Sequence, residues 1–144
     1  MGITIYADGG SRGNSGPAAI GVVVQKDGQT LKKYGETIGE ATNNQAEYQA
    51  VVFALKKIKL LFGKKKAKEM ELEILMDSEL VAKQLNRQYK IKEKDLQPLF
   101  LEILNVVLDF KKVNFRHILR EENKEADKLV NEALDNQNRE QPLL

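Results

Sequence analysis

Five short stretches of the chain are rich in β-branched and other apolar residues, and several alternate with polar positions, which predicts strands. They cover residues 3–7, 20–24, 30–38, 70–76 and 113–119. Asp8-Gly9-Gly10 follows the first stretch and Asp27-Gly28 the second, as expected of turns between antiparallel strands. The first three strands are therefore predicted to be antiparallel.

Four other stretches have apolar residues at the three- to four-residue spacing of helices. They cover residues 44–62, 78–86, 99–110 and 123–134. Thr42-Asn43-Asn44 offers N-cap residues to the first of them, Gly63 a stop signal, and Asn123 an N-cap for the last. The order βββ-α-β-α-α-β-α predicts a mixed α/β domain with an antiparallel start and later strands joined through helices.

The chain of 144 residues is expected to form one domain over residues 1–135, followed by a polar, Pro-containing tail over residues 136–144. It has no internal repeat and no interdomain linker. There is no secretory signal pattern and no apolar run near the ~18 residues that a membrane span needs. We therefore expect a cytoplasmic protein, and a monomer by default.

The composition narrows the chemistry that the chain can perform. It has no Cys and one His, with 23 Lys+Arg against 21 Asp+Glu. Thiol nucleophiles, thiolate zinc sites and His-rich metal sites are excluded, so that catalysis would fall to carboxylates or hydroxyls. Carboxylates at pH 7 suggest a hard divalent cation. The glycine-rich segment GGSRGNSGP lacks the Lys-Ser/Thr ending of a phosphate-binding P-loop.

Four acidic residues stand at positions that surface acids do not favour. Asp8 and Asp77 follow predicted strands, whereas Glu47 and Asp127 share the apolar faces of predicted helices. Any one of them alone is readily explained as a capping or surface acid. Together, with no basic residue one turn away on the same helix face, they favour a metal site. Four carboxylates can hold two divalent ions about 4 Å apart, the arrangement for in-line phosphoryl displacement.

Four sequence blocks resemble type 1 ribonuclease H, in the order and spacing of that family. They are DGGSRGNSGPAAIGVVV (8–24), TNNQAEYQA (42–50), MDSELVAKQL (76–85) and REENKEADKLVNEAL (120–134). The resemblance implies the ribonuclease H-like fold, a five-stranded mixed sheet flanked by helices. It also implies an endonuclease that binds RNA/DNA hybrids and cuts the RNA strand, leaving 5′-phosphate and 3′-hydroxyl ends. Whether duplex RNA is also cut stays open.

The resemblance assigns the four acids, Asp8, Glu47, Asp77 and Asp127, to two Mg²⁺ ions, with Mn²⁺ as a substitute. Asp8 and Asp127 would hold the ion that activates water, and Asp8, Glu47 and Asp77 the ion at the leaving 3′ oxygen. It also assigns substrate contacts. RNA 2′-hydroxyls would meet Ser11, Gly13 and Asn14, the DNA phosphate would meet Thr42 and Asn44, and minor-groove base edges would meet Asn43. Turn formation and helix capping explain the same residues, and both roles can hold together.

The chain departs from the family in the loop before the last helix, where many members carry an assisting His. The only His is His117, which shares the face of Phe115 on a predicted strand, so a packed structural role is favoured over a catalytic one. Arg120 opens the loop. It either contacts phosphate in place of the missing His or pairs with Glu121 or Glu122.

Other departures concern nucleic-acid affinity. Glu79 stands where relatives often present Gln to the RNA, and its charge is expected to weaken that contact. The basic connection with Arg87, Lys90, Lys92 and Lys94 resembles a reduced form of the family's basic protrusion, and no N-terminal hybrid-binding domain is expected. A lysine run over residues 56–68 either follows phosphates or, the favoured interpretation, is a solvated face.

Two alternatives to a ribonuclease remain at the level of the sequence. A nuclease-dead or weakly active nucleic-acid-binding module of the same fold is disfavoured because all four acids are present. A DNA-cutting nuclease or transposase of the same broad fold is disfavoured by the turn that resembles a 2′-hydroxyl reader and by the short chain.

Overall fold

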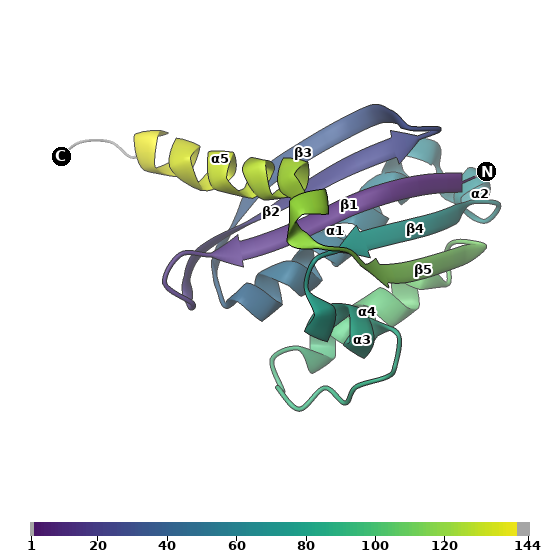
Figure 1. Cartoon of the computed structure of the whole chain (residues 1–144). Helices are drawn as coiled ribbons and strands as arrows, with labels where there is room; N and C mark the ends of the chain where they lie inside the picture. Colours follow the sequence, from purple (N-terminus) through teal and green to yellow (C-terminus); the bar gives the residue numbers. More distant parts are fainter. Residues whose placement is uncertain (1, 141–144) are drawn as a thin grey trace.

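The computed structural model describes the backbone of residues 2–140 and the side chains of residues 2–137. The strands are β1 (Gly2–Ser11), β2 (Gly16–Lys26), β3 (Gln29–Ala41), β4 (Glu71–Met76) and β5 (Lys112–His117). The helices are α1 (Asn43–Phe62), α2 (Lys64–Ala67), α3 (Glu79–Leu85), α4 (Gln97–Val107) and α5 (Lys124–Glu140), with a 3₁₀ turn at Arg120–Glu122. Figure 1 shows their arrangement.

The five strands form one mixed sheet in the order β3-β2-β1-β4-β5. The β1–β2 and β2–β3 pairs are antiparallel, whereas β1–β4 and β4–β5 are parallel. This confirms the fold class predicted from the sequence. The central strand is β1, which pairs with β4 through Tyr6 and with β2 as far as Ser11.

Helices cover both faces of the sheet. α1 lies behind β1 and β2 and packs on α4, while α5 crosses the front over β2 and β3 (Figure 1). The helical spacing of α1 buries Val51, Leu55 and Ile58, as predicted, in the main core. Under α5 lies a smaller apolar cluster that contains Val130 and Leu134. The last helix is thus held by a narrower apolar stripe than the first.

The first strand is longer than its sequence pattern predicts. β1 continues through Gly9 and Gly10 to Ser11, and these residues pair with β2. Glycine is typical of turns, but here antiparallel pairing with β2 overrides that local preference. Asp8 therefore lies inside a strand, opposite Gly21, and not at its end.

The other boundaries differ in smaller ways. Gly63 ends α1 as predicted, but the short helix α2 follows it at once. α5 extends to Glu140, past the predicted domain boundary at residue 135, and residues 141–144 of the predicted tail lie outside the described residues. Within residues 2–140, every helix is too short or too polar to cross a membrane.

Candidate active site

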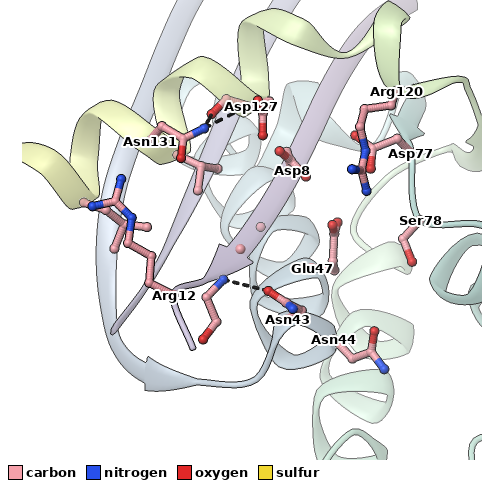
Figure 2. A pocket seen from close by; sticks show the side chains of 15 residues that line it. Asp8, Arg12, Asn43, Asn44, Glu47, Asp77, Ser78, Arg120, Asp127 and Asn131 are labelled. Carbon is pink, nitrogen blue, oxygen red and sulfur yellow. Dashed lines mark hydrogen bonds between the residues drawn. The ribbon is translucent and has the colours of Figure 1, made fainter. Parts of the chain in front are cut away.

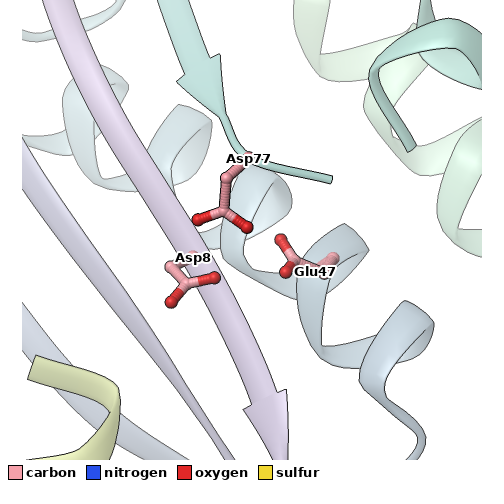
Figure 3. A group of neighbouring side chains, drawn as sticks. All are labelled: Asp8, Glu47 and Asp77. Carbon is pink, nitrogen blue, oxygen red and sulfur yellow. The ribbon is translucent and has the colours of Figure 1, made fainter. Parts of the chain in front are cut away.

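Three of the four predicted carboxylates converge. Asp8, Glu47 and Asp77 each offer one oxygen, and these oxygens lie within 4.8 Å of one another (Figure 3). The parallel register explains the two aspartates: Tyr6 of β1 pairs with Leu75 of β4, and each acid follows two residues later. Neighbouring parallel strands thus deliver both carboxylates to the same end of the sheet.

Glu47 reaches this place because α1 begins very close to β1. A Cβ built on Gly9 would lie 2.2 Å from the carbonyl carbon and oxygen of Ala46, the residue before Glu47. Only glycine permits that backbone approach. The residue after Asp8 therefore determines how near Glu47 comes to it.

Asp127 belongs to α5, which lies on the other face of the sheet from α1 (Figure 1). A Cβ on Gly21, the β2 partner of Asp8, would lie 2.2 Å from the carbonyl oxygen of Ala126. Asp127 lines the same cleft (Figure 2) but is outside the group of three converging oxygens. The inference that it lies on a buried face is wrong: Asp127 is exposed, while Val130 is buried beneath the helix.

The four acids line a cleft of about 380 Å³. Its other lining residues are Gly9, Gly10, Ser11, Arg12, Asn43, Asn44, Ser78, Arg120, Val130, Asn131 and Leu134. On the α5 side, the Asn131 side-chain amide donates to the Asp127 backbone carbonyl at 3.1 Å. The wall is mostly polar, as expected of a site that binds charged groups.

The electrostatics of the cleft call for a cation. Burial, and then the negative charge of Asp77, raises the pKa of Asp8 to about 7. Burial and the charge of Asp8 likewise raise the pKa of Glu47 well above its usual value. Among the described residues, no Lys, Arg or His forms an ion pair with Asp8, Glu47, Asp77 or Asp127. Oxygen donors that repel one another fit a hard divalent ion.

Sequence reasoning missed the role of Asn123 at this site. The residue precedes α5, as predicted, but its buried side chain does not cap the helix. Its amide nitrogen instead donates to the backbone carbonyl of Ala7 at 3.0 Å and to Asp77 Oδ2 at 2.9 Å. Capping preference is local, so the sequence had no signal for these long-range bonds.

The predicted RNA-contacting turn is tied to the start of α1. The Ser11 N–H donates to Asn43 Oδ1, and the Asn43 N–H donates to Asn14 Oδ1, each at 2.8 Å. Gly13 and Asn14 have φ values of 94° and 25°, so the turn-forming interpretation is confirmed for them. Ser11, Asn14 and Asn43 thus form one hydrogen-bonded rim, of which Ser11 and Asn43 line the cleft. Their contacts with nucleic acid stay predictions.

The remaining helix-start residues have structural partners of their own. The Thr42 hydroxyl accepts from the Gln45 N–H at 3.1 Å, and the Gln45 side chain accepts from the Thr42 N–H at 2.9 Å. This is a capping box, as the capping interpretation of Thr42 requires. The Asn44 side chain donates to Glu93 at 3.2 Å. A contact of Thr42 or Asn44 with DNA phosphate stays a prediction.

The packed position expected for His117 is wrong. His117 is exposed, and its Nδ1 lies 4.0 Å from Glu79 Oε2. His117 is the last residue of β5, and β5 is an edge strand, so alternation along the strand does not ensure that this side chain is covered. The buried residue here is Ile118. Glu79 also pairs with Lys83 at 3.2 Å, which offsets part of its charge.

The alternatives for Arg120 and for the lysine run differ in outcome. Arg120 lines the cleft and, among the described residues, has no ion pair with Glu121 or Glu122. Two lysines of the run have acidic partners outside the cleft lining: Lys56 pairs with Glu102, and Lys59 with Asp109. These pairs favour the interpretation of the run as a solvated face.

The chain is similar to known proteins over most of its length. The family model described as "Reverse transcriptase-like" matches residues 6–133. The chain is 42% identical over 131 residues to Ribonuclease HI of Halobacterium salinarum, covering 90% of this chain and 63% of that protein. It is 39% identical over 137 residues to Bifunctional protein Rv2228c of Mycobacterium tuberculosis, covering 94% of this chain and 36% of that protein. The chain therefore spans about a third of the mycobacterial relative.

The fold has close counterparts among solved structures. LC11-RNase H1, crystallised in complex with an RNA/DNA hybrid, superposes with a TM-score of 0.88 at 44% sequence identity. The match covers 94% of this chain and 98% of that one. The likeness therefore extends over most of the chain.

Proposed function

This chain belongs to the type 1 ribonuclease H family, and from that premise we propose that it is an endoribonuclease that hydrolyses the RNA strand of RNA/DNA hybrids. Its products would carry 5′-phosphate and 3′-hydroxyl ends. The observation that carries the proposal is the convergence of Asp8, Glu47 and Asp77 in a cleft, without a compensating cation from the protein. The protein is proposed to act as a monomer in the cytoplasm.

A divalent metal is the cofactor that fits this donor set, and we propose Mg²⁺, with Mn²⁺ as a substitute. The residues that would hold two such ions are Asp8, Glu47, Asp77 and Asp127. Bound there, the ions would supply a lowered pKa for the attacking water and stabilisation of the charge on the leaving 3′ oxygen.

The protein's own groups would orient the substrate. In the rim formed by Ser11, Asn14 and Asn43, Ser11 and Asn14 would meet RNA 2′-hydroxyls together with Gly13, and Asn43 would meet minor-groove base edges. Thr42 and Asn44 would meet the DNA phosphate. Arg120 also lines the cleft (Figure 2), and its guanidinium would hold a phosphate of the RNA strand.

Cleavage of labelled duplexes tests the proposal. An RNA/DNA hybrid, duplex RNA and duplex DNA are each incubated with Mg²⁺, Mn²⁺ or EDTA. We expect metal-dependent cutting of the hybrid's RNA strand, lost in Asp8→Asn and kept in Asp27→Asn, the same substitution in the exposed β2–β3 turn. Cutting that survives EDTA, or persists in Asp8→Asn, contradicts the metal mechanism. Binding of the hybrid without cutting would indicate a nuclease-dead module.

A further inference from the structure

Asn123 lies where three of the carboxylate-bearing segments meet. Its side chain, in a residue only 1% exposed, donates to the carbonyl of Ala7, directly before Asp8 in β1, and to the carboxylate of Asp77 after β4. Its own backbone carbonyl accepts from the Asp127 N–H at 3.1 Å in the first turn of α5. One residue thus connects the backbone at Asp8, the side chain of Asp77 and the backbone at Asp127.

The orientation of the Asn123 amide follows from its partners. A backbone carbonyl and a carboxylate oxygen both accept hydrogen bonds, so the amino group, and not the amide oxygen, must face them. Its two hydrogens are then used, one for each partner. The amide oxygen Oδ1 is buried and has no hydrogen-bond partner among the described residues. The protein therefore uses only the amino end of this side chain.

The chemistry of this donor matters for Asp77. A hydrogen bond to Oδ2 restricts rotation of the Asp77 carboxylate, which offers one of the three oxygens that converge with Asp8 and Glu47 (Figure 3). A Lys or Arg at the same place would also orient Asp77, but its positive charge would compete with a bound metal ion. A neutral amide orients the carboxylate and keeps its negative charge available.

We propose that Asn123 is a positioning residue that fixes Asp77 relative to Asp8 for divalent-metal binding. It acts through these two residues and does not itself touch the metal. The proposal rests on the proposed function, because it concerns the same metal site. The competing explanation is that Asn123 only stabilises the start of α5, in which case its removal lowers stability and leaves metal affinity unchanged.

Asn123→Leu separates these explanations. Leucine is close to asparagine in shape, removes both amide bonds and keeps the backbone bond to Asp127. The matched control is Gln84→Leu, since Gln84 is also a buried amide, 4% exposed. Gln84 accepts from the Tyr48 hydroxyl at 2.7 Å and donates to the Lys90 carbonyl at 3.3 Å, outside the residues that line the catalytic cleft.

Three quantities are measured on each full-length protein: Mn²⁺ affinity by isothermal titration without nucleic acid, kcat and KM for the hybrid, and the melting temperature in EDTA. Loss of a hydrogen bond that orients a metal ligand typically weakens metal binding about 10–100-fold. We expect that loss in Asn123→Leu, with kcat reduced and KM for the hybrid unchanged. Gln84→Leu is expected to keep wild-type Mn²⁺ affinity whatever its melting temperature.

Asn123→Ala removes the same donor without adding bulk, and the same loss of affinity is expected. Wild-type Mn²⁺ affinity in either folded Asn123 variant overturns the proposal. If both variants fail to fold while Gln84→Leu folds, the role of Asn123 is structural and the proposal is also overturned. If the wild-type protein itself binds no Mn²⁺ and cuts no hybrid, it is the proposed function that fails.

Discussion

Gly9 and Ala46 touch backbone to backbone: a Cβ on Gly9 would fall 2.2 Å from the carbonyl carbon and oxygen of Ala46. The two residues are the immediate neighbours of Asp8 and Glu47. Backbone atoms cannot move away by a rotamer change, as a side chain can. The distance between these two carboxylates therefore depends on the lack of a Cβ at Gly9. The spacing of Asp8 and Glu47 is therefore set by the packing of α1 on β1.

The first prediction concerns this contact. Gly9→Ala is expected to lower the free energy of unfolding by about 3 kcal/mol or more, because overpacking against backbone is not relieved by a rotamer change. Gly2→Ala is the control, since a Cβ there meets nothing within 4 Å, and it should change stability by no more than about 0.5 kcal/mol. Urea unfolding measures both. Equal stabilities of the two variants would show that α1 is free to move away from β1.

The second prediction concerns pH in the absence of metal. The pKa of Asp8 is raised from 3.8 to about 7, so between these values the folded protein binds a proton that the unfolded chain releases. The stabilisation is complete below pH ~4 and is lost as pH rises toward 7, with a slope of at most about 1.4 kcal/mol per pH unit from this group. In EDTA, Asp8→Asn should flatten this dependence in urea unfolding at several pH values. An unchanged slope in the variant contradicts the raised pKa.

The third prediction concerns Arg120. If its guanidinium holds a phosphate, Arg120→Ala should lower kcat/KM for the hybrid by about tenfold or more, the equivalent of one charge-assisted hydrogen bond, without changing the melting temperature. Arg116→Ala is the control, because Arg116 is an exposed arginine of β5 that pairs with Glu73 and does not line the cleft. Similar kcat/KM values for both variants would remove Arg120 from the substrate contacts.

The fourth prediction concerns the single histidine. Because His117 is exposed at the sheet edge and absent from the cleft lining, His117→Ala should alter neither the free energy of unfolding, beyond about 0.5 kcal/mol, nor metal-saturated turnover. The sequence alone favoured a loss of stability, as expected of a packed residue. Thermal unfolding and initial rates on the hybrid decide between them, and a large loss in turnover would assign His117 a role in the reaction.

Much of the fold was predictable because the informative patterns are local. Apolar spacing identified α1 and its buried face. The order of strands and helices along the sequence distinguished the antiparallel start from the later strands, which are parallel in the sheet. The convergence of Asp8, Glu47 and Asp77 was predictable as well, since parallel strands and an inward first helical turn both direct side chains to one end of the sheet.

The features that escaped prediction depend on partners distant in sequence. The Asn123 amide bonds to a carbonyl 116 residues earlier, which no capping rule can indicate. In the sequence Gly9 is typical of a turn, and only its pairing with β2 shows that it belongs to a strand. His117 alternates as a buried residue would, but alternation does not reveal that its strand is at the edge of the sheet.

The carboxylates that line the cleft come from four separate segments, and the last of them, Asp127, belongs to the helix that crosses the front of the sheet. During synthesis, the proposed metal site therefore stays incomplete until residue 127 has left the ribosome and α5 has packed over Gly21. A partly synthesised chain already carries the rim that would meet RNA, yet it lacks the full set of acids. The proposed metal site is thus completed only when the last helix has packed on the sheet.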